Sequence, residues 1–243
     1  MDTSITTGAF FVIDGTDGAG KATQTRKLVE RFVSEGRAVE TISFPQYGAK
    51  SAGMVEEYLG GKYGENAKDV NAKAASIFYA VDRFDASFKI KQWVAEGKIV
   101  ISDRFVGSNM GHQGGKITDQ DERSAYLAWN DDMEHNILRI PRPTLNVILS
   151  VPVEVAMKLA KQGEKEKTKV KGDIHEKDPD HLQASIETFK EVATNFPGYH
   201  LIDCSQEGGL RTIEDIHEEI WRAVQLHVPT PLILNNKHQQ ATV

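Results

Sequence analysis

A glycine-rich segment near the start of the chain has the residue types and spacing of a phosphate-binding loop. Residues 15–21 read Gly-Thr-Asp-Gly-Ala-Gly-Lys and directly follow the apolar run Phe10-Phe11-Val12-Ile13. The glycines allow backbone N–H groups to curve around phosphate oxygens, and the lysine can place its ammonium on the β- and γ-phosphates. A helix that begins at the lysine would direct the positive end of its dipole at the same anion. We therefore expect a nucleoside triphosphate to bind at Gly15, Thr16, Asp17, Gly18, Ala19, Gly20, Lys21, Ala22 and Thr23.

One position departs from the usual pattern of such a loop. The residue after the lysine is commonly Ser or Thr, whose hydroxyl binds Mg²⁺, but here it is Ala22, and the hydroxyl comes one place later at Thr23. Because a helix turns by about 100° per residue, Thr23 cannot simply take the vacated place. Either water and carboxylates hold the metal, or Thr23 binds it because the chain follows a slightly different course there, or the loop no longer supports catalysis.

Charged side chains at two further positions are suited to phosphate and metal chemistry. Ser102-Asp103-Arg104-Phe105 follows another apolar run, where Asp103 could orient Mg²⁺ and Arg104 could grip a phosphate and stabilise the transition state. Asp17 lies inside the glycine loop, where a carboxylate is unfavourable beside a triphosphate unless it faces a metal or a hydroxyl. We expect Lys21, Arg104 and Asp17 to be catalytic and Asp17 and Asp103 to bind the metal. The alternative for Asp103 and Arg104 is a surface ion pair.

A third candidate site lies in the long helical segment 71–96. Arg83 stands in an otherwise apolar stretch, and Tyr79 precedes it by four residues, so that both point to one side of a helix. An aromatic ring and a guanidinium on one face could stack on a nucleobase and hydrogen-bond to it. The alternative is a packed tyrosine beside an arginine that extends out of the core.

The stretch 161–172 has no apolar periodicity, and glycines stand near both of its ends. It is either a solvated charged loop or a mobile lid that brings cations over bound phosphates. Its candidate cations are Lys161, Lys165, Lys167, Lys169 and Lys171.

The elements that must position these residues alternate along the chain. Short apolar runs predict strands at Ala9–Asp14, Ala38–Ser43, Lys98–Asp103, Leu145–Ser150 and His200–Asp203. Helical patterns lie between them, at 21–35, 51–59, 71–96, 120–138, 153–161, 178–194 and 212–226. Strands that alternate with helices predict a parallel sheet covered on both faces, with ligands beyond the carboxyl ends of the strands.

Composition restricts the class of protein. The chain has 243 residues, of which 40% are hydrophobic and 26% charged, and its net charge of −6 does not favour nucleic acid as a partner. The single cysteine, Cys204, excludes an internal disulfide and fits a reducing compartment. No apolar segment approaches the ~20 residues of a membrane span, and the start lacks the features of a signal peptide. We expect a cytoplasmic enzyme without a membrane partner, folded as one domain over 1–228 and followed by a polar tail at 229–243.

Four motifs, in order and spacing, make the chain resemble the thymidylate kinase family from about Phe10 to Val224. They are Asp14–Lys21, Phe44-Pro45-Gln46-Tyr47-Gly48, the run Ser102–Asn109 with His112-Gln113-Gly114, and Ile140-Pro141-Arg142-Pro143 before a strand. The resemblance implies a three-layer P-loop NTPase sandwich, with a five-stranded parallel sheet in the order 2-3-1-4-5 and a lid at about 161–177. It also implies Mg²⁺-dependent transfer of the γ-phosphate of ATP to dTMP, giving dTDP for dTTP synthesis, in a homodimer packed through long helices.

The resemblance assigns roles to individual residues. It implies that Asp17 binds the 3′-hydroxyl, Tyr79 stacks on thymine, Arg83 contacts O4, and Arg104 bridges the two phosphate groups. Ser108 and Asn109 would lie near the base, with Asn109 at its N3 edge. The substrate-binding residues expected on this basis are Asp17, Phe44, Tyr79, Arg83, Arg104, Ser108, Asn109, His112 and Gln113.

The chain also departs from the family pattern. Gln46 stands where many relatives carry an arginine directed at the dTMP phosphate, and His112 replaces a Tyr or Phe near the 2′ position of the sugar. The phosphate loop lacks the arginine that some relatives use, so the resemblance implies that the basic stretch 161–171 supplies the catalytic cation.

Two other functions remain open at this point. One is a kinase for another nucleoside or nucleoside monophosphate. The other is a catalytically inactive nucleotide-binding module, in which Ala22 marks the loss of metal chemistry.

Overall fold

Five parallel strands form one sheet in the order β2-β3-β1-β4-β5. The structure is a computed structural model that describes residues 8–64, 66–166, 179–207 and 209–229. The strands are β1 (Ala9–Gly15), β2 (Val39–Ser43), β3 (Ile99–Asp103), β4 (Leu145–Ser150) and β5 (Tyr199–Asp203). Each of the five predicted strands is confirmed, and so is the predicted order.

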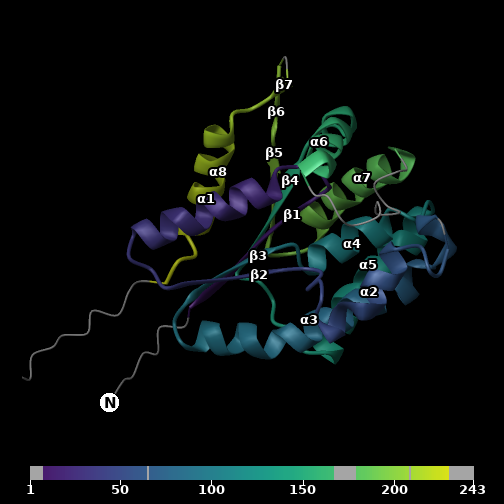
Figure 1. The fold of residues 1–243 in the computed structure, drawn as a ribbon, viewed down its shortest axis with the longest axis horizontal. Helices are drawn as coiled ribbons and strands as arrows, with labels where there is room; N and C mark the ends of the chain where they lie inside the picture. Colours follow the sequence, from purple (N-terminus) through teal and green to yellow (C-terminus); the bar gives the residue numbers. More distant parts are fainter. Residues whose placement is uncertain (1–7, 65, 167–178, 208, 230–243) are drawn as a thin grey trace, which may run out of the picture.

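Helices cover both faces of this sheet (Figure 1). They are α1 (Lys21–Ser34), α2 (Gly53–Leu59), α3 (Ala72–Ala95), α4 (Val106–Gly114), α5 (Gln120–Asp131), α6 (Val153–Glu166), α7 (Pro179–Asn195) and α8 (Ile213–Gln225). Two-residue strands β6 (Ser205–Gln206) and β7 (Gly209–Leu210) pair in antiparallel fashion before α8. Single-turn 3-10 helices occupy Lys50–Ala52 and Ala67–Asp69.

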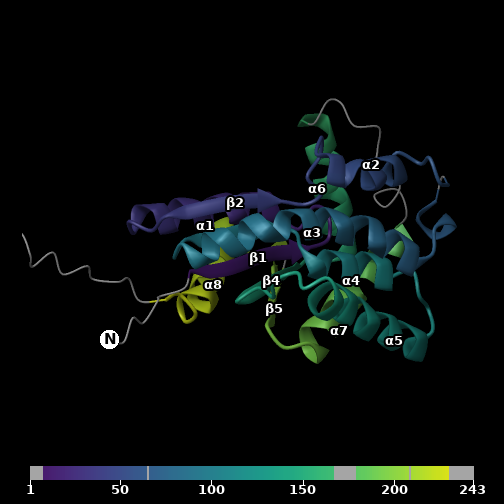
Figure 2. The ribbon, with the colours of Figure 1, turned by 90° about the horizontal axis from the view of Figure 1, so that it is seen from below.

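The residues of β1 alternate between the two halves of the core, as a strand buried on both faces requires. Phe11 and Ile13 pack with α1 and α8, whereas Phe10 and Val12 pack with α3, α4 and α7. Figure 2 shows the sheet between these layers. This is the predicted three-layer sandwich.

The apolar stripe of α3 faces outward. The predicted helix is confirmed, but Ile77, Val81, Phe84 and Phe88 are 48%, 50%, 40% and 63% exposed. The buried side carries small residues, including Ala75, Ala80 and Ala86, together with the buried Arg83. Periodicity therefore identified the helix, while the smaller side chains determined which side packs against the rest of the domain.

Two elements near the pocket differ from the prediction. Residues 106–114, which were not predicted as a helix, form α4, whose glycines allow close packing: a Cβ at Gly111 would lie 2.5 Å from the ring of Phe189 in α7. The predicted helix 120–138 is α5 followed by a π-helical turn over Asp132–Ile137. Such turns often mark functional sites because they redirect side chains.

The basic stretch begins inside a helix. The helix predicted at 153–161 continues to Glu166 as α6, so Lys161 and Lys165 belong to a helical backbone. Lys167, Lys169 and Lys171 lie outside the described residues, as do 230–243. The lid and the domain boundary at 228 therefore remain predictions. No helix in the described ranges is long and apolar enough to cross a membrane.

Candidate active site

The glycine loop connects the end of β1 to the first turn of α1. Gly18 and Gly20 adopt φ values of 78° and 84°, which disfavour any side chain. At Gly18 a Cβ would also lie 2.3 Å from the backbone oxygen of Ala156. These constraints explain the glycines and leave the N-terminus of α1 directed at whatever the loop binds.

Lys21 lies at this N-terminus with its side chain only 7% exposed. Its Nζ donates to the backbone oxygen of Thr16 at 2.8 Å and is 3.8 Å from Oδ1 of Asp17. Burial, together with the positive charge of Arg104, lowers the pKa of Lys21 to about 8. A desolvated ammonium of this kind favours an anionic ligand.

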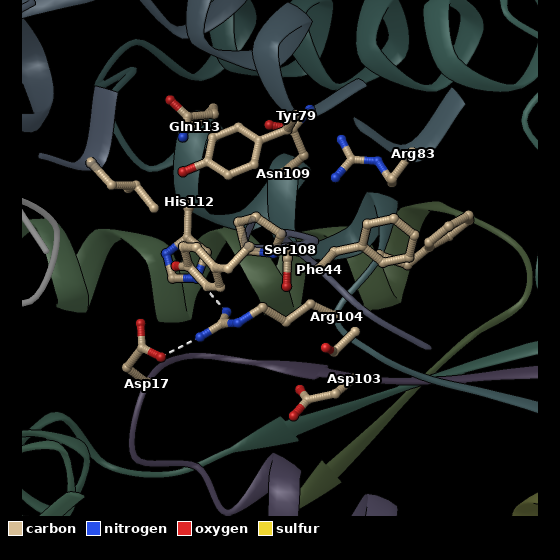
Figure 3. Close-up of a pocket in the computed structure, with 15 residues that line it drawn as sticks. Asp17, Phe44, Tyr79, Arg83, Asp103, Arg104, Ser108, Asn109, His112 and Gln113 are labelled. Atoms are coloured by element: carbon tan, nitrogen blue, oxygen red, sulfur yellow. Dashed lines mark hydrogen bonds and ion pairs between the residues drawn. The ribbon is translucent and has the colours of Figure 1, made fainter. Parts of the chain in front are cut away.

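Arg104 joins the carboxyl end of β3 to the glycine loop. Its Nη2 donates a short hydrogen bond to Oδ1 of Asp17, and its Nη1 is 3.4 Å from Nε2 of His112. Both interactions are drawn as dashed lines in Figure 3. The structure thus brings together the predicted catalytic residues Lys21, Asp17 and Arg104.

Asp103, the last residue of β3, has a carboxylate oxygen that is buried and accepts no hydrogen bond from the described residues. It lines both a cavity beside the glycine loop and an open groove along α1. Ala22 and Thr25 line the same groove, whereas Thr23 does not. Of the two threonines in α1, Thr25 is therefore the one that lines this groove, three residues beyond Ala22.

A cavity of about 330 Å³ opens beside the loop (Figure 3). Every substrate-binding residue predicted from the sequence lines it: Asp17, Phe44, Tyr79, Arg83, Arg104, Ser108, Asn109, His112 and Gln113. Further lining residues, which the sequence prediction did not include in the substrate site, are Ser43, Pro45, Tyr47, Leu59, Asp103 and Phe105. In Figure 3 the carboxylates of Asp17 and Asp103 lie at one end and Tyr79, Arg83 and Gln113 at the other. The cavity is of small-molecule size and has a charged end and an aromatic end.

The aromatic side chains that line the cavity pack against further aromatic rings. Tyr58 of α2 meets the ring of Tyr79 edge to face, with centroids 6.3 Å apart and planes at 89°. Phe44 packs against Phe105 at 5.4 Å. These contacts restrict the rings that face the cavity and so prepare an apolar surface for a flat ligand.

Arg83 forms a buried ion pair at this end. Its Nε and Nη2 both donate to the carboxylate of Glu134 at 2.6 Å, and each residue is at most 1% exposed. Burial alone would lower the pKa of Arg83, but the adjacent carboxylate raises it above its ordinary value. The pair therefore keeps a charged guanidinium at the cavity.

Asn109 contacts the same carboxylate. Its Nδ2 donates to Oε1 of Glu134 at 2.9 Å, to Oδ1 of Asn130 at 3.0 Å and to the backbone oxygen of Ser76 at 3.3 Å. Sequence reasoning missed Glu134 and Asn130. The one available signal was Arg83 itself, because a buried guanidinium requires a carboxylate partner.

Ser108 lines the cavity, but its hydroxyl donates a short hydrogen bond to the buried carboxylate of Asp14. The amide of Asn146 donates to Asp14 at 2.7 Å, and the N–H of Phe105 does so at 3.2 Å. Burial raises the pKa of Asp14, although these hydrogen bonds oppose the effect. This cluster fixes the start of α4 against the end of β1.

Gln46 is directed to Asp82. Its backbone N–H and its Nε2 donate to the Asp82 carboxylate at 2.8 Å and 3.0 Å. It lines the outer groove and not the cavity. At the charged end of the cavity the cationic side chain is therefore that of Arg104, and Lys21 lies beside it at the glycine loop.

His112 lies on α4 beside the cavity, with its ring against Phe189 at 5.5 Å and 87°. Its Nε2 faces Arg104, as described above. The imidazole thus lies between the charged end and the aromatic end of the cavity.

A family model, several curated proteins and a solved structure that are similar to this chain all carry the same description. A family model described as "Thymidylate kinase" matches residues 13–220. A thymidylate kinase of Mycobacterium tuberculosis is 32% identical over 182 residues, which cover 74% of this chain and 84% of the relative. A probable thymidylate kinase of Thermococcus onnurineus is 32% identical over 223 residues, covering 89% and 97%. The human thymidylate kinase is 25% identical over 213 residues, covering 88% of each chain.

Among solved structures, one of thymidylate kinase from Candida albicans matches with a TM-score of 0.66 at 19% sequence identity. The match covers 90% of this chain and 92% of that one. At this level of identity the likeness concerns the fold.

Proposed function

Because the chain belongs to the thymidylate kinase family, we propose that it transfers the γ-phosphate of ATP to the 5′-phosphate of dTMP, giving dTDP for dTTP synthesis. It is a nucleoside monophosphate kinase, a transferase with a phosphate group as acceptor. The observation that best supports the substrate is the single cavity that joins Arg104 and the glycine loop at one end to Tyr79, Arg83 and Asn109 at the other. The two other functions, a kinase for a different acceptor and an inactive nucleotide-binding module, find no support among the relatives.

In this proposal the acceptor lies in the cavity. Thymine stacks on Tyr79, with O4 near Arg83 and its N3 edge at Asn109. The deoxyribose lies between Asp17, which binds the 3′-hydroxyl, and His112. Phe44, Ser108 and Gln113 complete the walls. The 5′-phosphate then reaches Arg104, the cation between the cavity and the phosphate loop.

The donor occupies the glycine loop, with backbone N–H groups and Lys21 around its β- and γ-phosphates. The acceptor atom is already an anionic oxygen, so no general base is required. The protein must place the two nucleotides in line and neutralise their charge. Arg104 and Lys21 supply part of that charge, and the lysines of 161–171 supply the rest, since residues 15–21 contain no arginine.

Asp103 fits a role in holding Mg²⁺, because its buried carboxylate oxygen has no hydrogen-bond partner among the described residues. No group of three or more His, Cys, Asp or Glu that could enclose a metal exists in the described part of the chain. Mg²⁺ is commonly held by one or two carboxylates, water and substrate phosphates, so this absence does not argue against it. Asp17 is the other carboxylate available, although it also pairs with Arg104. When bound, the ion would neutralise phosphate charge.

We propose a homodimer that buries the exposed stripe of α3. Ile77, Val81, Phe84 and Phe88 form a row of large apolar side chains at helical spacing, and contiguous apolar surface of this kind marks interaction sites. We also propose a cytoplasmic location, because the single cysteine is buried as a free thiol.

The test is ADP formation by the purified protein with ATP and Mg²⁺, with and without dTMP. A panel of other nucleosides and monophosphates, and a reaction with EDTA, complete it. We expect dTMP to stimulate ADP formation most strongly and EDTA to abolish it. ATP binding without dTMP-dependent turnover would instead favour the inactive module.

A further inference from the structure

Glu134 is a fully buried carboxylate that lies directly behind the aromatic end of the cavity. It belongs to the π-helical turn after α5, is 0% exposed and does not line the cavity. It therefore cannot touch a ligand there. Any influence on the ligand must pass through its neighbours.

Its neighbours are two residues that do line the cavity. Arg83 donates to Glu134 through Nε and Nη2, and Asn109 donates through Nδ2. Figure 3 shows the two side chains at the same end of the cavity. One carboxylate thus fixes the orientation of a guanidinium and of an amide that stand side by side.

The orientation of the Asn109 amide follows from this arrangement. Three acceptors surround Nδ2: Oε1 of Glu134, Oδ1 of Asn130 and the backbone oxygen of Ser76. If the amide were turned by half a rotation, its oxygen would face a carboxylate oxygen at 2.9 Å. Glu134 therefore holds Nδ2 of Asn109 away from a ligand and leaves Oδ1 of Asn109 to accept a hydrogen bond from it. This oxygen is buried and accepts no hydrogen bond from the described residues.

The Arg83 guanidinium is constrained in the same sense. Because Nε and one N–H of Nη2 are committed to Glu134, Nη1 and the second N–H of Nη2 are left to donate to a ligand. The cavity thus presents an acceptor on Asn109 beside a donor on Arg83. This pair is complementary to a base with an N3–H donor next to an O4 acceptor, as in thymine or uracil. Cytosine presents an acceptor at N3 and an amino donor at position 4. It would therefore set an acceptor against the Asn109 oxygen and a donor against the Arg83 N–H.

We propose that Glu134 is a positioning residue that selects bases with N3–H and O4 over cytosine, by fixing the polarity of Asn109 and the free donor of Arg83. The inference rests on the proposed function, because it takes a pyrimidine monophosphate as the acceptor. Sites built to hydrogen-bond a substrate group reject analogues that lack it by factors on the order of 10⁴. We expect dTMP to be preferred over dCMP by a factor of this order.

The test compares wild type with Glu134→Gln for dTMP and dCMP. The neutral amide no longer holds both neighbours, so the KM for dTMP should rise about 10- to 100-fold, with a smaller effect on kcat. The ratio of kcat/KM for dTMP over dCMP should fall by at least about tenfold. Calorimetric binding of each monophosphate without ATP should show the same shift.

A matched control is Glu191→Gln, because Glu191 pairs with Arg123 at 2.8 Å and neither residue lines the cavity. Glu191→Gln removes an ion-paired carboxylate by the same substitution, and it should leave the ratio of kcat/KM for dTMP over dCMP unchanged. Glu134→Asp keeps the charge with a shorter side chain and should shift the ratio in the same direction by a smaller factor.

A measurement on wild type does not depend on whether a variant folds. N3-methyl-dTMP cannot donate from N3 and should bind at least about tenfold more weakly than dTMP. Equal binding of the two, or an unchanged dTMP preference in a folded Glu134→Gln variant, would overturn the inference. A wild-type protein that does not phosphorylate dTMP at all would instead refute the proposed function.

Discussion

The guanidinium of Arg104 donates a hydrogen bond to the carboxylate of Asp17, which lies 87 residues earlier in the chain. Arg104 has a φ of 67°, an unfavourable value for a residue with a side chain. The backbone N–H of Arg104 donates to the backbone oxygen of Ile13 at 3.0 Å, and the Ser102 hydroxyl donates to the backbone oxygen of Arg104 at 2.6 Å. The fold therefore holds this cation beside the glycine loop before any ligand binds.

Arg104→Ala should lower kcat by on the order of 10²–10³, because a preorganised charge at the transferring phosphoryl group is lost. Arg104→Lys should fall between wild type and Ala, since it keeps the charge but not the guanidinium fork. Steady-state kinetics with saturating ATP and dTMP measure both, and thermal unfolding shows that the variants are folded. Near-normal turnover by Arg104→Ala would refute the assigned role.

Asp17→Ala should remove the preference for a 3′-hydroxyl. Wild type should use dTMP about 10- to 100-fold better, in kcat/KM, than the monophosphate that lacks this hydroxyl, because a hydrogen bond to a carboxylate is lost. In Asp17→Ala the two acceptors should be used almost equally. If the variant keeps the wild-type ratio, the 3′-hydroxyl is bound elsewhere.

Replacing Lys161, Lys165, Lys167, Lys169 and Lys171 together by Gln should lower kcat and leave the affinity for dTMP unchanged. These lysines are proposed to act on the phosphoryl group in transit and not on the base. The control replaces the exposed Lys62, Lys68 and Lys190 by Gln. Equal turnover in both variants would show that 161–171 is merely a solvated charged segment.

Nucleotide binding should take up a proton above pH 8. Lys21 has a pKa of about 8 in the free protein because it is buried near Arg104, and a bound triphosphate raises that pKa. Below about pH 7 Lys21 is protonated in both the free and the nucleotide-bound protein, so binding takes up no proton there. Near pH 9 Lys21 is largely neutral in the free protein, so the uptake approaches one proton per bound nucleotide. Calorimetry in two buffers of different ionisation enthalpy measures the uptake. A Lys21→Met variant that shows the same uptake would assign the proton to another group.

Val81→Lys and Phe88→Glu should each convert the proposed dimer to a monomer, because they place a charge within the apolar stripe of α3. Val33→Lys is the control, since Val33 is 57% exposed on α1, outside the stripe. Sedimentation velocity gives the mass of each. A wild-type protein that sediments as a monomer would refute the proposed interface.

The predicted strands and the glycine loop are correct because both depend on neighbouring residues. An apolar run followed by Gly15, Gly18 and Gly20 specifies a strand and a turn without distant contacts. The parallel sheet then brings the carboxyl ends of β1 and β3 to one edge, with Ile13 paired to Asp103. That is why residues chosen for following a strand, such as Asp17 and Arg104, lie in one cavity.

Helix α4 was missed because its glycines weaken the local signal, and close packing against Phe189 in α7 stabilises it instead. The direction of the α3 stripe was equally hidden, since periodicity identifies a helix without saying which side faces the core.

The sequence by itself determined the five strands, most of the helices, the glycine-rich loop after β1 and nine of the side chains that line the cavity. Only the tertiary structure decided how the side chains at the aromatic end are oriented. Glu134 lies 51 residues from Arg83 and 25 from Asn109 in the chain. A buried carboxylate makes its contacts across such distances only after the helices have packed, and no local pattern encodes which guanidinium and which amide it will hold.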